Sequence, residues 1–151
     1  LDPQWLAIKE AAIPGLIGIG VLLSTYTRYP LIRTLVYNPK FMNVEKIRQR
    51  LNESNNSGAF ETRLKNATYL LSSTFLFSSA MNYVLAKSVV TSPAGSASFN
   101  EELGQMTLLS YPVITIPATL MMMGILYYLW RTINGLTGLK LEEILVSPHL
   151  R

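Results

Sequence analysis

Cysteine is absent from the 151-residue chain, and histidine occurs once, as His149. Without cysteine the chain has no disulfide, thiolate metal site, iron–sulfur cluster or thiol nucleophile. A single histidine excludes a haem held by two histidines, and a histidine-rich zinc site, if either is built from this chain alone. The sequence also lacks a P-loop, a dinucleotide-binding fingerprint and a nucleophile–base set. We therefore expect no catalytic residues, no metal site and no cofactor.

Charged residues are also scarce. They make up 15% of the chain, whereas soluble domains carry roughly 25%. Hydrophobic residues make up 49%, and the mean hydropathy is +0.26 in spite of a long polar middle segment. The apolar residues are therefore concentrated in runs of about the length that spans a bilayer. The sequence predicts an all-α polytopic membrane protein, a single membrane domain with about three transmembrane helices plus short interfacial helices. The predicted spans cover about 8–27, 66–87 and 104–130.

The positive charges are distributed unevenly between these runs. Eight of the 13 Lys and Arg residues lie in segment 28–65, none lies in 88–106, and the tail 131–151 carries three. The positive-inside rule then predicts a cytoplasmic loop 28–65, an outer loop 88–103 and a cytoplasmic tail 131–151. Because the charges flank apolar runs, the expected partner is the lipid bilayer and not nucleic acid.

The predicted orientation places the start of the chain outside. No basic n-region of a cleavable signal peptide precedes the first run. We therefore expect an odd number of spans before Leu1, which makes this chain the C-terminal portion of a longer polytopic protein.

Two short segments outside the runs are amphipathic. The piece VEKIRQRLN (44–52) reads as a short helix with Val44, Ile47 and Leu51 on one face and charges on the other. In the tail, Leu141, Ile144 and Leu145 beside two glutamates predict a helical turn on the membrane surface.

Four phrases of the sequence carry a resemblance. They are YPLIRTLVYNPKF (29–41), FETRLKNATYLLSSTFLFSSAMNYVLA (60–86), VVTSPAGSASFNEELGQMTLLSYPVI (89–114) and TGLKLEEIL (137–145). Together they resemble an uncharacterised family of bacterial six-span inner-membrane proteins, loosely described as transporter-like or septation-protein-like. The resemblance covers Ile13 to Leu145 and implies that this chain is the C-terminal half of such a protein, in the bacterial inner membrane. No catalytic or binding residue can be assigned to this chain from the resemblance.

Small residues recur on the first two predicted spans. Small side chains let neighbouring helices approach closely, although the lining of a pore would also be small and polar. Packing is the commoner use, so we expect the polar members of this stripe to be less exposed than Leu70, Phe77 and Leu85. The residues are Gly15, Gly18 and Gly20 on the first span and Ser72, Ser79 and Asn82 on the second.

Charged residues mark the outer ends of the second and third spans. Lys87 ends the second span, where a lysine either extends to the headgroups or serves a function inside the bilayer. Ser98 and Glu101 match a capping box, which predicts a helix start. Glu101 and Glu102 also offer acid–base or cation-binding groups, but capping is the simpler role. We predict an outer ion pair between Lys87 and Glu101.

The third span contains Pro112 and Pro117, each of which removes a backbone donor and predicts a kink. Such kinks hinge some transporters, but static kinks are frequent in membrane helices. Met121, Met122 and Met123 follow, and packing explains them better than a copper site.

These features predict a non-enzymatic integral membrane protein, a structural or accessory subunit that packs by its helices in a larger membrane assembly. Its expected partners are other transmembrane helices, from its own missing half or from partner subunits. The alternative is half of a small-solute transporter or channel, which would need a polar pathway through the bilayer.

Overall fold

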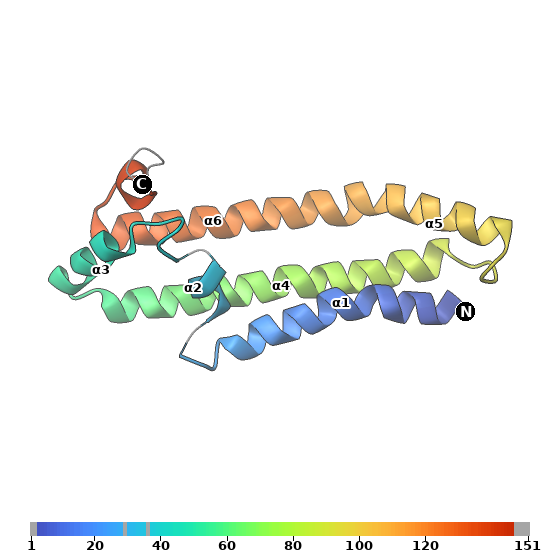
Figure 1. Cartoon of the computed structure of the whole chain (residues 1–151), viewed down its shortest axis with the longest axis horizontal. Coiled ribbons are helices and arrows are strands. Elements are labelled where there is room, and N and C mark those ends of the chain that lie inside the picture. The colour runs from blue at the N-terminus through green and yellow to red at the C-terminus, as the bar shows by residue number, and fades with distance from the viewer. Residues whose placement is uncertain (1–2, 29, 36, 147–151) are drawn as a thin grey trace. The chain divides into compact units, whose positions relative to one another are not determined.

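The computed structural model describes residues 3–28, 30–35 and 37–146, with side chains from residue 5 onward. In this part of the chain the structure is all-α (Figure 1), as predicted. The long helices are α1 (Pro3–Ser24), α4 (Ser57–Val89), and a continuous run of α5 (Ala97–Ser110), the π-helical segment η1 (Tyr111–Thr115) and α6 (Ile116–Thr137). Three short helices are α2 (Leu31–Leu35), α3 (Val44–Glu53) and α7 (Leu141–Ile144). His149 and Arg151 lie outside the described residues.

Among the residues that the structure describes, two helical stretches are long and apolar enough to cross a membrane: Trp5–Ser24 and Ala97–Thr137. Within the most apolar 18 residues of each stretch, only 17% is buried. The first overlaps the predicted span 8–27, and the second contains the predicted span 104–130. The second predicted span, 66–87, lies within α4, whose serines, threonines and asparagines make it less apolar.

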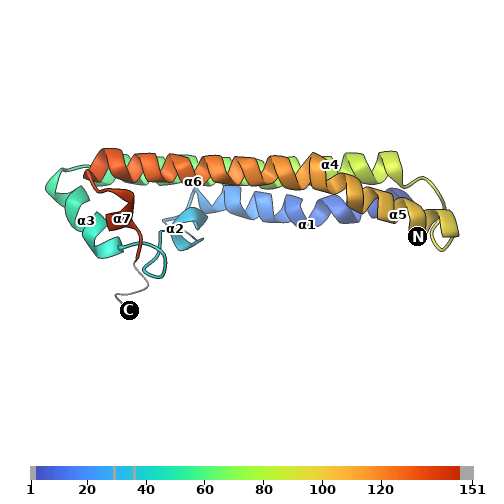
Figure 2. The same cartoon turned by 90° about the horizontal axis from the view of Figure 1, so that it is seen from above.

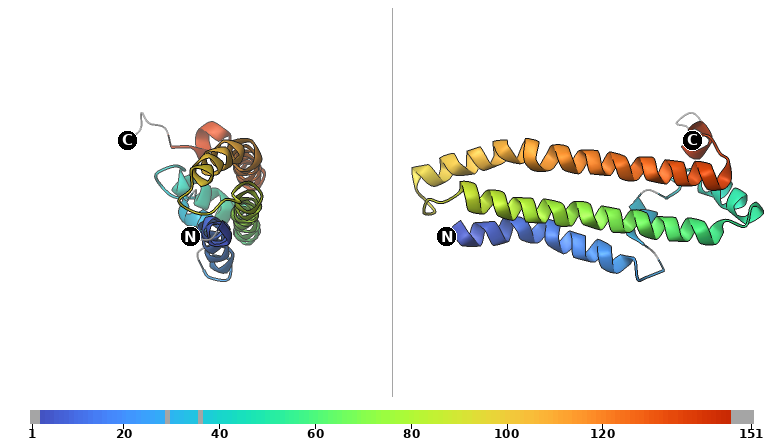
Figure 3. Two further views of the ribbon diagram at one scale, coloured as in Figure 1. Left: turned by 90° about the vertical axis from the view of Figure 1, so that its right-hand side faces the viewer. Right: turned by 180° about the vertical axis from the view of Figure 1, so that it is seen from behind.

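The chain divides into two compact units. The first unit comprises Leu1–Gly20 and Ser72–Met123, and in it α1 lies beside α4 (Figure 3). Its core is a cluster contributed by α1, α4, α5, η1 and the residue after α4. The buried members of the cluster are Ala7, Leu85, Ala86, Val90, Met106 and Ile114.

The second unit comprises Val21–Leu71 and Gly124–Arg151. Within it, α3 has the amphipathic pattern predicted, since Ile47 and Leu51 are buried and Arg48 and Arg50 are exposed. Asn43 caps α3, because its side chain accepts a hydrogen bond from the Lys46 amide.

Helix α7 docks against α3 in the second unit (Figure 2). The Asn43 amide donates to the Ile144 carbonyl over 2.8 Å, and the Val146 amide donates to the Phe41 carbonyl over 3.2 Å. Gly138, with φ +73°, allows the chain to turn between α6 and α7. Ile144 is buried, but Leu141 and Leu145 are exposed, so the three predicted residues do not share one environment.

Candidate functional site

In the first unit, α1 and α4 are joined by hydrogen bonds from serine side chains to backbone. Ser72 Oγ donates to the Gly18 carbonyl over 2.8 Å, and Ser79 Oγ donates to the Ala11 carbonyl over 2.7 Å. Such bonds form only where backbones approach closely, which is the use predicted for small residues on facing helices.

The glycines show how close the approach is. A Cβ atom on Gly15 would lie 2.9 Å from Ser79 Oγ, and one on Gly18 would lie 3.0 Å from Leu76 Cδ2. Gly20, grouped with them from the sequence, has no atom within 4 Å of the same position. The reason is helical geometry, because two residues rotate the side-chain direction by about 200°. Only Gly15 and Gly18 belong to this contact.

The other residues of the predicted stripe behave unequally. Ser72 is 1% exposed, whereas Ser79 and Asn82 are half-buried. Asn82 Nδ2 donates to the Ser78 carbonyl of its own helix over 2.7 Å, so it does not bridge helices. Leu70 is exposed as expected, but the prediction for Leu85 was wrong: it is buried in the core cluster, because this end of α4 packs on more than one face.

The ion pair predicted between Lys87 and Glu101 does not form. Lys87 Nζ lies 3.3 Å from Tyr83 Oη and 5.5 Å from the centre of that ring. Tyr83 is one turn earlier on the same helix, so its contact with the ammonium group does not depend on the conformation of the loop between α4 and α5. Glu101 is exposed and makes no ion pair among the residues that the structure describes.

The neighbouring carboxylate, Glu102, has a structural partner that the sequence did not reveal. It accepts hydrogen bonds from both the amide and the hydroxyl of Thr91 and of Ser92, over 2.8–3.3 Å. It therefore holds the turn that follows α4.

The start of α5 differs from the prediction, because Ser96 caps this helix by accepting a hydrogen bond from the Phe99 amide over 3.1 Å. Ser98, the predicted cap, lies inside the helix.

This arrangement predicts that Glu102→Ala releases the turn at Thr91 and Ser92. Both backbone amides lose their acceptor, so their hydrogen exchange should accelerate about tenfold or more. Exchange measured by NMR tests this, and Glu101→Ala is the matched control. Equal acceleration in both variants would contradict the role of Glu102.

The two prolines of the third predicted span occupy different environments. Pro112 is the second residue of η1, where the Ile116 amide donates to the Tyr111 carbonyl five residues earlier. Proline has no backbone N–H to donate, and this wider turn accommodates the missing hydrogen bond. Pro117 is the second residue of α6, which continues directly from η1, so it too removes a backbone donor from a continuous helical run.

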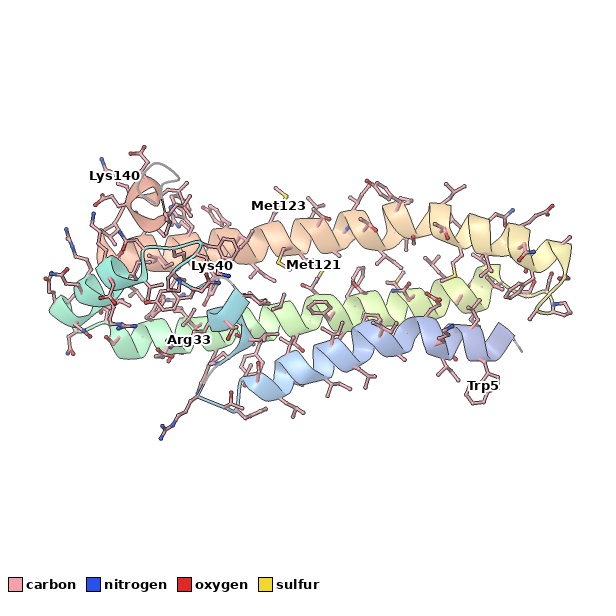
Figure 4. The ribbon with its side chains drawn as sticks, in the orientation of Figure 1. Trp5, Arg33, Lys40, Met121, Met123 and Lys140 are labelled. Atoms are coloured by element: carbon pink, nitrogen blue, oxygen red, sulfur yellow. The ribbon has the colours of Figure 1, made fainter. Side chains whose placement is uncertain are left out.

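No metal site emerges in the described part of the chain. It contains no group of three or more His, Cys, Asp or Glu side chains placed to hold an ion. Met121 and Met123 project from opposite sides of α6 (Figure 4), so the methionine run does not converge on one point.

A second polar cluster ties α2 to α4 in the second unit. Arg33 forms an ion pair with Glu61 (Figure 4 labels Arg33), and its guanidinium carbon lies 5.7 Å from the centre of the Tyr37 ring. Tyr37 packs edge-on against Phe60, with ring centres 5.0 Å apart. Burial raises the pKa of the Tyr37 hydroxyl. The phenol therefore stays neutral, and the arginine contacts an uncharged ring.

A further ion pair joins α3 to α7. Lys46 Nζ lies 3.1 Å from Glu143 Oε2. The hydrogen bond from Lys46, and a second from the Lys140 amide, hold the pKa of the Glu143 carboxyl below its ordinary value of 4.5. A lowered pKa means that this contact stabilises the fold above pH 4.5 and is lost as the pH falls below that value.

We therefore expect acidification below pH 4.5 to loosen α7. The protection of the Asn43 and Val146 amides against hydrogen exchange, corrected for the intrinsic pH dependence, should decrease. Glu143→Gln should lower protection at neutral pH and weaken the response to acid. Glu142→Gln, one residue away and exposed, should leave the response intact; if it abolishes the response, the assignment to Glu143 fails.

Comparisons with protein-family models, with curated proteins and with solved structures found no match. The resemblance to a six-span family stays a prediction, and the proposed function rests on the geometry of the chain.

Proposed function

We propose that the chain is a non-enzymatic integral membrane protein that packs by its helices in a larger membrane assembly. The observation that carries the proposal is the exposed apolar surface of the two candidate spans. Several large apolar side chains there are more than 60% exposed, among them Ile13, Leu16, Leu108 and Leu120. Monomeric soluble proteins rarely expose large contiguous apolar patches.

Energetics favour lipid or partner helices around these side chains. Full burial of a Leu or Ile side chain is worth roughly 1.5–3 kcal/mol relative to exposure to water. A surface with many such residues left in water would give up a large part of the few kcal/mol that stabilise a domain. In a bilayer the same surface carries no such penalty.

The polar groups of the first unit support packing over transport. Thr107 Oγ1 donates to the Leu103 carbonyl and Ser110 Oγ to the Thr107 carbonyl, each within its own helix. Ser72 and Ser79 donate across to α1. Each of these hydroxyls has a backbone partner, so they supply contacts between and within helices. Half of a small-solute transporter, the alternative, would need polar groups left to line a path.

Membrane insertion and orientation are testable together, because the chain has no cysteine of its own. Ala59 and Ser98 are exposed and lie in the predicted cytoplasmic and outer segments. In intact cells an impermeant thiol reagent should label Ser98→Cys but not Ala59→Cys, and both should react after lysis. The wild-type chain should stay in the membrane pellet after carbonate extraction.

Release of the wild-type chain by carbonate would contradict membrane integration. Labelling of Ala59→Cys but not Ser98→Cys in intact cells would reverse the predicted orientation without affecting the case for insertion.

A further inference from the structure

A basic hollow lies in the second unit, beside the end of α1, α2 and α4. Its volume is about 560 Å³, and Arg28, Arg33, Lys65 and Glu61 are among its lining residues. Three cations and one carboxylate leave a net charge of +2. The hollow is therefore suited to an anion.

The ion pair inside the hollow determines which cations are available. Arg33 is committed to Glu61 and lies over the ring of Tyr37. Its Nε atom is buried and has no hydrogen-bond partner. Arg28 and Lys65 are exposed and form no ion pair with any residue that the structure describes. These two side chains carry the uncompensated charge.

The position of the hollow along the chain indicates the source of the anion. The candidate span Trp5–Ser24 ends four residues before Arg28, and Tyr26, between them, is 76% exposed. An apolar span followed by an exposed tyrosine and an arginine is the pattern found at the level of lipid headgroups. Leu23, 59% exposed, offers apolar surface for an acyl chain just before the hollow.

We propose that this hollow binds the phosphate group of an anionic phospholipid. Arginine donates paired, charge-assisted hydrogen bonds to phosphate oxygens, and lysine adds a point charge. Basic pockets beside membrane helices on the cytoplasmic side bind such headgroups. The proposal rests on the membrane location proposed above, and it names a ligand and the residues that hold it. Free inorganic phosphate has the same oxygen chemistry, but it has no acyl chain to contact Leu23.

The test uses the purified full chain in dodecyl maltoside micelles, titrated with phosphatidylglycerol or phosphatidylcholine, with bound lipid counted by native mass spectrometry. We expect phosphatidylglycerol to bind at least about tenfold more tightly than phosphatidylcholine. The double substitution Arg28→Gln, Lys65→Gln should weaken phosphatidylglycerol binding by at least about tenfold. The exchange Arg28→Lys, Lys65→Arg keeps both charges and should retain most of the affinity.

The matched control is Arg48→Gln, Arg50→Gln, which removes the same charge from exposed positions on α3. It should change phosphatidylglycerol binding by less than about threefold, since neither residue lines the hollow. Equal losses in the two double variants would show general electrostatic attraction and overturn the site. Displacement of phosphatidylglycerol by millimolar inorganic phosphate would overturn the assignment to lipid.

Carbonate extraction separates this proposal from the proposed function. If the wild-type chain stays in the membrane but shows no preference for phosphatidylglycerol, the headgroup site alone is wrong. If carbonate releases the wild-type chain, the membrane location is wrong, and the headgroup site with it.

Discussion

Replacing Gly18 with leucine is expected to separate α1 from α4 in the first unit and to lower the free energy of unfolding by roughly 3 kcal/mol, the upper end of the usual cost of overpacking. A Cβ atom there would lie 3.0 Å and 3.1 Å from two carbons of Leu76 and 3.2 Å from Phe75 Cβ. The last of these is fixed to the backbone of α4 and cannot move aside as a side-chain tip can. The Gly18 carbonyl also accepts the hydrogen bond from Ser72, which the shift would stretch.

The measurement is reversible unfolding of the purified chain in mixed micelles, and Gly20→Leu is the matched control. Gly20 lies two residues further along α1 and has open space around the same position. Leucine also has a better helix propensity than glycine, by roughly 0.5–1 kcal/mol, so Gly20→Leu should be neutral or slightly stabilising. Comparable destabilisation by both substitutions would mean that close packing at Gly18 is not the cause.

The contrast between Gly18 and Gly20 shows what the sequence made predictable. The recurrence of small residues indicated that helices approach closely, and Ser72 and Ser79 do bond to α1. Which glycine faces the partner depends on rotation about the helix axis. Apolar residues surround all three glycines, so hydrophobicity does not fix that rotation. Periodicity did fix it for α3, where charged residues occupy one face and Ile47 and Leu51 the other.

The outer ends of the helices were less predictable for a related reason. Proximity in sequence suggested that Lys87 meets Glu101, but the ammonium group has a nearer partner in Tyr83 on its own helix. Glu102, one residue further, binds the turn instead. Neighbouring positions on a helix point about 100° apart, so a register error of one residue changes which carboxylate meets the loop. The cap was misplaced by two residues for another reason: Ser96 and Ser98 both carry a hydroxyl that can cap a helix, and Ser96 does so.

Leu64 and Leu70 allow a second large effect to be tested within one helix. Both are leucines of α4 in the second unit, but Leu64 is 1% exposed and Leu70 is 45% exposed. Leu64→Ala should lower the free energy of unfolding by about 2–5 kcal/mol, because it removes buried methyl groups and leaves a cavity. Leu64 lies between Arg63 and Lys65, beyond the predicted span 66–87, so its burial removes apolar surface from water.

Leu70→Ala is the matched control, and its result depends on what surrounds α4. In the isolated chain in micelles the side chain contacts detergent, and its truncation should cost less than about 1 kcal/mol. In the native membrane a partner helix packed on Leu70 would make the same substitution weaken the assembly, which co-purification with the wild-type chain and the variant would reveal. A large loss for Leu70→Ala in micelles, equal to that for Leu64→Ala, would instead show that α4 is covered on this face by the chain itself. The exposed surface of α4 would then no longer support a packing role.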